Sequence, residues 1–236
     1  MLNKFWRLAF RLLYNECAFS YDLISRAVSL GHWRSWQRAA LRHLPAAETG
    51  LVLELAHGTG DLQLDLLRAG YSTVALDLSL QMGKLAQRKL SRARMAANLI
   101  RGDAFRLPFK SNSFSAIVCT FPTPFICSAS VLAEMERALA PSGRVAIVLA
   151  GQLAGGGILP ALIRRLYRIT GQRDVFLSGR ACVALIASDA FHVESEIVAL
   201  QGSAAQLLLL TKVATAAKSS ADLSLETASD LCYDAR

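Results

Sequence analysis

The sequence predicts a doubly wound α/β fold, in which a mainly parallel sheet carries helices on both faces. Short apolar runs alternate with stretches of helical periodicity, and this alternation is typical of parallel strands joined by crossover helices. The first run, at residues 51–55, is mostly apolar, as expected for a strand buried on both faces. A chain of 236 residues that is 53% hydrophobic can bury one large core, and no linker divides it. We expect strands at residues 51–55, 73–77, 97–100, 115–120, 144–149, 191–200 and 206–213.

The first predicted strand runs into a turn that contains two glycines. The strand includes Glu54, and the turn has Gly58 and Gly60. Glycine lets the backbone turn sharply and approach a ligand where a Cβ atom would clash. Residues 61–69 have helical periodicity, so the turn leads to the free N–H groups of a helix N-terminus. This arrangement predicts a nucleotide or cofactor loop, with an ordinary tight turn as the alternative.

Acidic residues follow the second and third predicted strands. Asp77 lies seventeen residues after Gly60, near the distance at which doubly wound folds place a ribose-binding carboxylate. Asp103 follows the third strand at the same sheet edge, where an adenine amino group would lie. A dinucleotide-binding fold needs a third glycine at the position of Gln63. The spacing therefore favours an adenosine-containing cofactor and makes an NAD-dependent oxidoreductase the least favoured alternative.

Together, these features resemble the class I, Rossmann-like S-adenosylmethionine-dependent methyltransferases. Residues 77–82 resemble the D-x-S-x-x-M motif of that class, and residues 102–114 resemble its segment after the third strand. Residues 134–143 are similar to its E-x-x-R-x-L-x-P-x-G helix and turn. The resemblance covers about residues 50–150 and implies a seven-stranded sheet with the last strand antiparallel. The implied cofactor is S-adenosyl-L-methionine, and its implied contacts are Glu54, Ala56, His57, Gly58, Thr59, Gly60, Asp77, Leu78, Met82, Asp103, Ala104 and Thr120.

Within the class, the ubiquinone/menaquinone C-methyltransferases, of methyltransferase type 11, are the nearest resemblance. Residues 21–36 resemble their N-terminal Tyr-Asp helix and the Ser-x-Gly-x-His/Arg-x-x-Trp segment that follows it. Two departures stand against a direct transfer of substrate. Residues 120–127 lack the polar loop with Arg and Asn, and the glycine motif has Ala56 and His57 in place of its usual residues. A methyltransferase-like module that binds cofactor or a partner without catalysis is therefore the main alternative.

The expected methyl acceptor is small and hydrophobic or lipid-like, with C-, O- and N-methylation all open. Phe121 and Phe125 would form an apolar wall, and Tyr21 and His32 would line the same pocket. His32 and His57 are the candidate bases, although each also has a purely structural interpretation. We expect a helical lid or substrate cap at residues 1–45, the methyltransferase domain at residues 46–217 and a flexible tail at residues 218–236.

The net charge of +8 is concentrated near the N-terminus, where residues 1–43 hold seven Lys and Arg against two acids. Residues 4–13 form a basic amphipathic helix pattern, which predicts either a lid or peripheral contact with an anionic membrane. Nucleic acid is disfavoured, because basic pairs such as Arg88–Lys89 lack interleaved stacking aromatics. No metal spacing is present, and the oligomeric state is open. Five cysteines without close pairing predict reduced thiols, and with no signal peptide they predict a cytoplasmic location.

Overall fold

The computed structural model describes residues 21–154 and 190–213, and every structural statement below concerns those residues. Helices α2 (Tyr21–Val28) and α3 (Trp33–Arg38) open the described chain and lead to the short 3-10 helices η2 (Ala39–His43) and η3 (Ala47–Thr49). The remaining elements are β1 (Val52–Leu55), α4 (Asp61–Arg68), β2 (Thr73–Asp77), α5 (Leu80–Arg92), β3 (Asn98–Arg101), β4 (Phe114–Thr120), η4 (Pro124–Cys127), α6 (Ala129–Ala138), β5 (Leu139–Leu153), β6 (Phe191–Leu200) and β7 (Ser203–Lys212).

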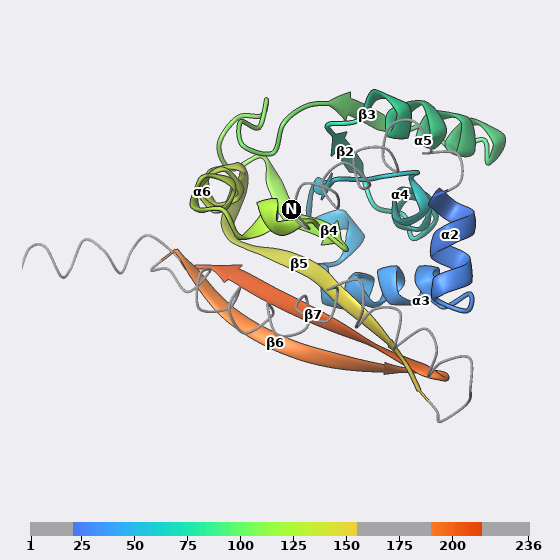
Figure 1. The fold of residues 1–236 in the computed structure, drawn as a ribbon. Coiled ribbons are helices and arrows are strands. Elements are labelled where there is room, and N and C mark those ends of the chain that lie inside the picture. The colour runs from blue at the N-terminus through green and yellow to red at the C-terminus, as the bar shows by residue number, and fades with distance from the viewer. Residues whose placement is uncertain (1–20, 155–189, 214–236) are drawn as a thin grey trace, which may run out of the picture.

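The seven strands form one sheet in the order β3-β2-β1-β4-β5-β7-β6 (Figure 1). Strands β1 to β5 pair in parallel, whereas β7 runs antiparallel to both β5 and β6. The predicted class and the antiparallel last strand are thus confirmed. The carboxyl ends of β1, β2 and β4 lie side by side, because Leu55 is in register with Leu76 and with Cys119.

The largest difference from the predicted strand bounds lies in β5, and β7 also begins earlier than predicted, at Ser203 rather than at residue 206. Strand β5 begins at Leu139 rather than at residue 144, and Leu139 pairs with Phe114 ahead of an irregularity in the ladder. Ser142 has a positive φ of 60° in this region, so the chain bends before the regular pairing starts at Arg144. The bend accommodates the Pro141-Ser-Gly143 segment, in which the sequence pattern predicted a turn.

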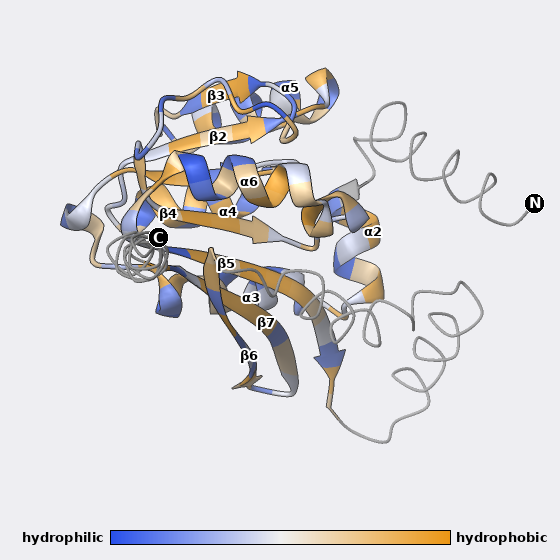
Figure 2. Ribbon diagram, turned by 90° about the vertical axis from the view of Figure 1, so that its left-hand side faces the viewer, coloured by the Kyte–Doolittle hydropathy of each residue, from blue (hydrophilic) through white to orange (hydrophobic). Residues whose placement is uncertain are grey.

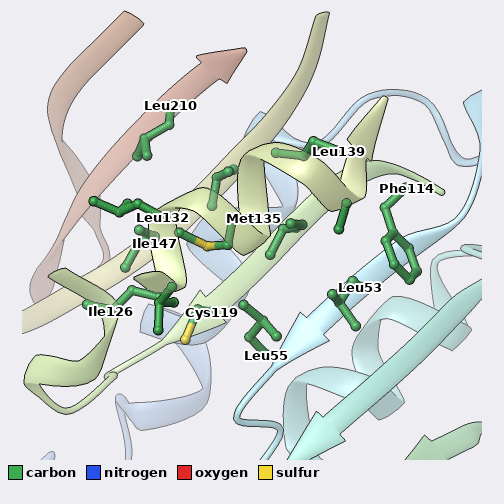
Figure 3. Close-up of a cluster of buried hydrophobic side chains, with 14 of the residues drawn as sticks. Leu53, Leu55, Phe114, Cys119, Ile126, Leu132, Met135, Leu139, Ile147 and Leu210 are labelled. Atoms are coloured by element: carbon green, nitrogen blue, oxygen red, sulfur yellow. The ribbon is translucent and has the colours of Figure 1, made fainter. Parts of the chain in front are cut away.

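Both faces of the central part of the sheet are covered, which explains why β1 and β4 are buried along most of their length. Figure 2 shows the central strands β4, β5 and β7 as predominantly hydrophobic ribbons. One face packs under α6, where Met135 and Leu132 belong to one buried cluster with Ile147 and Leu210 (Figure 3). The opposite face packs against α3, η2 and α4. Burial of apolar surface on both faces is the main stabilising contribution to the fold, at about 25 cal/mol for each Å² removed from water.

Helix α3 is fixed to the domain by a pair of arginines that share one carboxylate. Arg34 and Arg38 each make two hydrogen bonds of 2.7–2.9 Å to Asp65 on α4. Burial alone would raise the pKa of Asp65, but the two guanidinium groups outweigh this and hold the pKa below its usual value. Two of the basic residues that give the N-terminal segment its charge are therefore engaged within the fold.

Trp36 anchors the same helix to the sheet through its indole ring. Its side chain is only 2% exposed and lies against Gly151 of β5, at a point where a Cβ atom added to the glycine would be 2.0 Å from the ring. No side chain larger than hydrogen fits there without displacing the indole. Glycine at position 151 is thus required by the approach of α3 to the sheet.

Several sequence-based expectations fall outside the described residues. These are the basic amphipathic helix at residues 4–13 and the tail at residues 218–236. None of the helices described is long and apolar enough to cross a bilayer. Cys119 is a buried free thiol, whereas Cys127 is disulfide-bonded, so the expectation of reduced thiols is wrong for Cys127.

We predict that Gly151→Ala lowers the free energy of unfolding by about 3 kcal/mol, because the new methyl group must displace the Trp36 ring. Chemical denaturation followed by Trp fluorescence measures this change. Gly83→Ala is the matched control, since a Cβ atom there meets nothing within 4 Å and the residue lies inside α5. That control should gain up to about 1 kcal/mol from helix propensity. Equal stability of the two variants would contradict the packing argument.

Candidate functional site

The two-glycine turn after β1 has a left-handed backbone at every second residue. The φ angles are +55° at Ala56, +54° at Gly58 and +81° at Gly60. Ala56 adopts this conformation although it has a Cβ atom, which costs about 1–2 kcal/mol relative to glycine. Alanine at this position therefore adopts a backbone conformation that glycine would adopt without this cost.

Asp77, at the end of β2, holds this turn in place. Its Oδ2 atom accepts a hydrogen bond of 2.8 Å from the N–H of Gly58, and its Oδ1 atom accepts one of 2.8 Å from the N–H of Ser79. A carboxylate can accept about four hydrogen bonds, so acceptor capacity remains for a ligand. The geometry fits the expected contact with ribose hydroxyls and adds a structural role that spacing did not reveal.

Glu54 is a buried acid at the carboxyl end of β1. Its side chain is only 2% exposed, and among the described residues nothing hydrogen-bonds to its Oε2 atom. Burial raises the pKa of Glu54 well above its usual value, and the nearby negative charge of Asp77 adds to this effect. An acceptor of this kind fits a ligand that carries a positive charge, as S-adenosylmethionine does on its ammonium and sulfonium groups.

His57 lies inside the turn rather than on its surface. It is 5% exposed, and its Nδ1 atom lies 2.8 Å from the carbonyl oxygen of Gly58. Burial lowers the pKa of His57, although Asp77 opposes this shift, so the ring is favoured in its neutral form. With Nδ1–H donating to the carbonyl, Nε2 is the ring atom able to accept a proton.

The other residues expected to contact the adenosine part of the cofactor differ in how exposed they are. Leu78 is 65% exposed at the sheet edge, whereas Met82 is fully buried beneath it and supports the site from the core. Asp103 is exposed, and its Oδ1 atom accepts a hydrogen bond of 3.0 Å from the N–H of Phe105. Ala104 is half-buried against the core cluster under α6.

The loop after β3 is positioned by two residues of the motif on α6. Glu134 accepts a hydrogen bond of 2.7 Å from the N–H of Leu107, and Arg137 donates one of 2.7 Å to the carbonyl oxygen of Phe109. Glu134 and Arg137 also pair with each other at 2.8 Å. The two motif segments that carry the resemblance are therefore structural partners, and they fix the loop that follows Asp103.

An aromatic wall stands at the carboxyl end of β4. Phe121 has a positive φ of 50° and stacks on Trp33 of α3 with ring centroids 4.0 Å apart. Thr120 accepts a hydrogen bond of 3.2 Å from the side-chain amide of Gln37. Phe125 lies on η4 and packs against the core cluster under α6. The wall thus brings α3 and the end of β4 together beside the predicted cofactor residues.

The described contacts of the His32 ring are with Trp36 and Ser203 rather than with Phe121, and the position of the Tyr21 side chain is not described. His32 stacks on Trp36 with ring centroids 6.3 Å apart, and its Nδ1 atom lies 3.2 Å from the hydroxyl of Ser203. The structure therefore ties His32 to the turn between β6 and β7. Tyr21 begins α2, and its side chain is not among those that the structure describes.

A cavity of about 390 Å³ opens beside the turn, which is within the range of small-molecule pockets. It shares His57 and Asp77 with the predicted cofactor residues and is also lined by Ser79 and Leu80. The cavity continues between α5 and β3 toward Lys84, Arg88 and Arg101, and does not reach Asp103. It therefore borders the predicted site on the α5 side.

Sequence reasoning missed the part played by three residues. Trp33 and Gln37 complete the aromatic wall, but they lie more than eighty residues before their partners Phe121 and Thr120, and no spacing rule joins them. The sequence shows Lys89 only as part of a basic pair with Arg88, whereas the structure places it between Asp22 and Asp61. Only the packing of α2, α4 and α5 brings these charges together.

Comparison with known proteins agrees with this geometry. A family model described as "Methyltransferase domain" matches residues 52–143. The demethylmenaquinone methyltransferase of Deinococcus radiodurans is 35% identical over 173 residues, which cover 72% of this chain and 71% of that protein. The ubiquinone/menaquinone biosynthesis C-methyltransferase UbiE of Geotalea daltonii is 32% identical over 142 residues, covering 58% of this chain and 60% of that protein.

Solved structures with this fold include two methyltransferases of low sequence identity. A putative S-adenosyl-L-methionine-dependent methyltransferase from Methanococcus maripaludis has a TM-score of 0.58 at 18% identity, covering 85% of this chain and 94% of that one. The geranyl diphosphate C-methyltransferase of Streptomyces coelicolor, with S-adenosyl-L-homocysteine bound, has a TM-score of 0.55 at 13% identity, covering 76% of this chain and 77% of that one. At these identities the likeness concerns the fold.

We predict that Gly58→Ala reduces the affinity for S-adenosylmethionine by more than about tenfold, because the new methyl group enters the open space in front of the turn. Isothermal titration calorimetry measures this affinity. Gly70→Ala is the matched control, since both glycines have a positive φ and a Cβ atom meets nothing within 4 Å at either site. Both variants should lose about 1 kcal/mol of stability from the left-handed conformation. Equal cofactor affinity in the two variants would show that the turn does not face the cofactor.

We also predict opposite effects of Glu54→Gln on stability and on binding. Because the folded-state pKa of Glu54 is raised, its ionisation destabilises the fold progressively as pH rises above the unfolded value of about 4.3. Without cofactor, Glu54→Gln should therefore melt above the parent near neutral pH, and this difference should vanish toward about pH 4. Affinity for S-adenosylmethionine should fall about tenfold, because a charged acceptor is lost. A melting difference that is independent of pH would refute the assignment.

Proposed function

Because this chain belongs to the class I S-adenosylmethionine-dependent methyltransferases, and is homologous to the demethylmenaquinone methyltransferases, we propose that its acceptor is a small apolar ring compound. The enzyme takes its methyl group from S-adenosylmethionine. The observation that carries the proposal is the stack of Trp33 on Phe121 at the end of β4. This stack offers an apolar, planar surface next to the strand ends that carry the proposed cofactor contacts.

The backbone at Phe121 supports a role in binding. A left-handed conformation is costly for an aromatic residue and is maintained only where the surroundings impose it. Here the N–H of Phe121 donates a hydrogen bond of 2.7 Å to the carbonyl oxygen of Val148, which fixes the residue at the strand end. Strained backbone of this kind clusters at ligand sites. We therefore assign Phe121 and Trp33 to the acceptor pocket.

We assign the cofactor to the strand ends of β1 and β2. Asp77 would accept from ribose hydroxyls, Glu54 would face a positive group, and Gly58 and Gly60 would leave the backbone of the turn open. S-adenosylmethionine supplies a methyl group already activated by a sulfonium, so the protein's main tasks are to orient the acceptor and to exclude water. Asp103 lies on the next loop at the same edge and is assigned to the adenine side.

A carbon or phenol acceptor also needs to lose a proton. We favour His57 over His32 as the base, because His57 lies in the cofactor turn and burial favours its neutral form. One ring nitrogen of His32 is engaged near Ser203. Loss of activity in His57→Asn with unchanged S-adenosylmethionine affinity is the behaviour expected of a base.

The names of the relatives suggest the first acceptor to test. Demethylmenaquinone is a planar, largely apolar quinone, and a C-methyl transfer to its ring suits the aromatic wall. The segment Thr120–Cys127 lacks the polar loop of the ubiquinone/menaquinone enzymes, so other apolar rings are tested beside it. Peripheral membrane contact through the basic residues before α2 stays a prediction from sequence.

The proposal is tested with purified enzyme, radiolabelled S-adenosylmethionine and three acceptors. These are a short-chain demethylmenaquinol, a monocyclic phenol of similar polarity and a hydrophilic amine. Label should enter one of the two ring compounds, and mass spectrometry with product fragmentation locates the new methyl group on carbon or oxygen. Transfer to the amine alone would overturn the assignment of an apolar acceptor.

We predict that Trp33→Ala raises the KM for the ring acceptor by at least about tenfold, because the stacking surface on Phe121 is lost. The Kd for S-adenosylmethionine should change less than about twofold. Trp33→Phe, which preserves a ring, should recover most of the acceptor affinity. If both variants lower cofactor affinity equally, Trp33 acts on the fold and not on the acceptor.

A further inference from the structure

Four side chains from three helices and the cofactor turn meet at the ammonium group of Lys89. Lys89 lies on α5, and its Nζ atom is 2.8 Å from Asp22 Oδ2 of α2 and 2.8 Å from Asp61 Oδ1 of α4. The same atom lies 3.1 Å from the hydroxyl of Thr59 in the turn. Thr59 also donates a hydrogen bond to Asp22 Oδ1. We call Asp22, Thr59, Asp61 and Lys89 the latch.

The latch is complete as a set of hydrogen bonds. An ammonium group has three donors, and the two carboxylates and the hydroxyl accept all three. The Thr59 hydroxyl accepts from Lys89 and donates to Asp22, which is the one direction that the three groups allow. Lys89 also separates two negative charges, so its removal would leave Asp22 and Asp61 facing each other across the interface.

Within the part of the chain that the structure describes, helix α2 makes little apolar packing with the rest of the fold. Among its side chains that the structure describes, only that of the small residue Ser25 is buried, whereas Leu23 is 72% and Ile24 is 42% exposed. By contrast, α3 is held by the buried ring of Trp36 and by the arginine pairs to Asp65. The polar contacts of Asp22 are therefore the main described attachment of α2 to the cofactor turn.

The latch also acts on the turn itself. Thr59 lies between Gly58, which is bonded to Asp77, and Gly60, where an added Cβ atom would be 2.8 Å from Ala86 of α5. Helix α5 thus contacts the turn at Ala86 and, one turn of helix later, at Lys89. A displacement of Lys89 or Asp22 would release the turn on the side opposite Asp77.

We propose that the latch holds α2 closed over the glycine turn and thereby sets the affinity for S-adenosylmethionine. Asp22 and Lys89 are positioning residues, because they act on the cofactor through Thr59 and the turn. Opening of the latch frees α2, and closing it restores the turn to its binding geometry. The inference rests on the use of S-adenosylmethionine and is independent of the acceptor proposed above.

The test variant is Lys89→Met, which keeps the length of the side chain and removes its charge. The KM for S-adenosylmethionine should rise about tenfold, whereas kcat at saturating cofactor and acceptor should stay within about twofold. Methyl transfer to whichever acceptor the radiolabel assay identifies gives both constants, and calorimetry gives the cofactor Kd without any acceptor. Lys89→Arg should restore most of the affinity, because it keeps the positive charge.

The salt dependence of the cofactor Kd distinguishes the proposed electrostatic role of Lys89 from a purely structural one. Between about 50 mM and about 500 mM NaCl, the cofactor Kd of the parent should rise severalfold, because partly exposed ion pairs are screened. The Kd of Lys89→Met should be almost insensitive to the same change. Arg92→Met is the matched control, since Arg92 is exposed on the same helix and makes no contact with the latch, and its Kd should follow the parent.

A double-mutant cycle that combines Lys89→Met with Asp22→Asn tests whether Lys89 acts through its ion pair with Asp22. The combined variant Asp22→Asn/Lys89→Met should lose less affinity than the sum of the two single changes, because they break the same contact. Asp22→Asn also serves alone if Lys89→Met does not fold, since it removes one charge and preserves the shape of the side chain. Unchanged cofactor Kd in Lys89→Met, additive losses in the cycle, or an equal loss in Arg92→Met would each overturn the proposal.

Discussion

The site depends on the hydrogen bond that the N–H of Gly58 donates to the carboxylate of Asp77. This contact joins the turn after β1 to the end of β2, and it needs the parallel pairing that places Leu55 beside Leu76. A charge-assisted hydrogen bond between adjacent strand ends gives the turn one position. The loop after β3 is attached to the same point, because the N–H of Gly102 donates to the carbonyl oxygen of Asp77.

The same burial that stabilises the sheet also places a destabilising polar group, the carboxyl group of Glu54, at the proposed site. Glu54 lies on a strand whose four residues are all buried, so its carboxylate is held away from water without a described partner for one oxygen. Such a group destabilises the protein without ligand, and it can form a stabilising interaction when a positively charged ligand binds beside it. Ala56 and Phe121 add strained backbone at the same sheet edge. The unfavourable features of the fold are concentrated where the cofactor and the acceptor are assigned.

The two departures from the usual glycine motif, Ala56 and His57, have different structural consequences. Ala56 keeps the left-handed conformation that glycine would adopt, so it changes the energy of the turn rather than its shape. His57 introduces a buried imidazole whose Nδ1 atom contacts the carbonyl oxygen of Gly58. The motif thus retains its geometry and gains a titratable group. Membership of a methyltransferase family agrees with the proposed assignment of this turn to the cofactor.

The sequence by itself determined the class of fold, the cofactor and the acids at the strand ends. The fold class and the acids follow from local signals, since hydrophobic runs define strands and the acids follow the glycine turn at characteristic spacings, whereas the identity of the cofactor followed from the resemblance to the class I methyltransferases. The early start of β5, the aromatic wall and the latch were decided only by the tertiary structure. Trp33 reaches Phe121, and Lys89 reaches Asp22, across separations that no periodicity encodes. Such contacts depend on how helices pack on a common sheet, and that packing is a property of the whole chain.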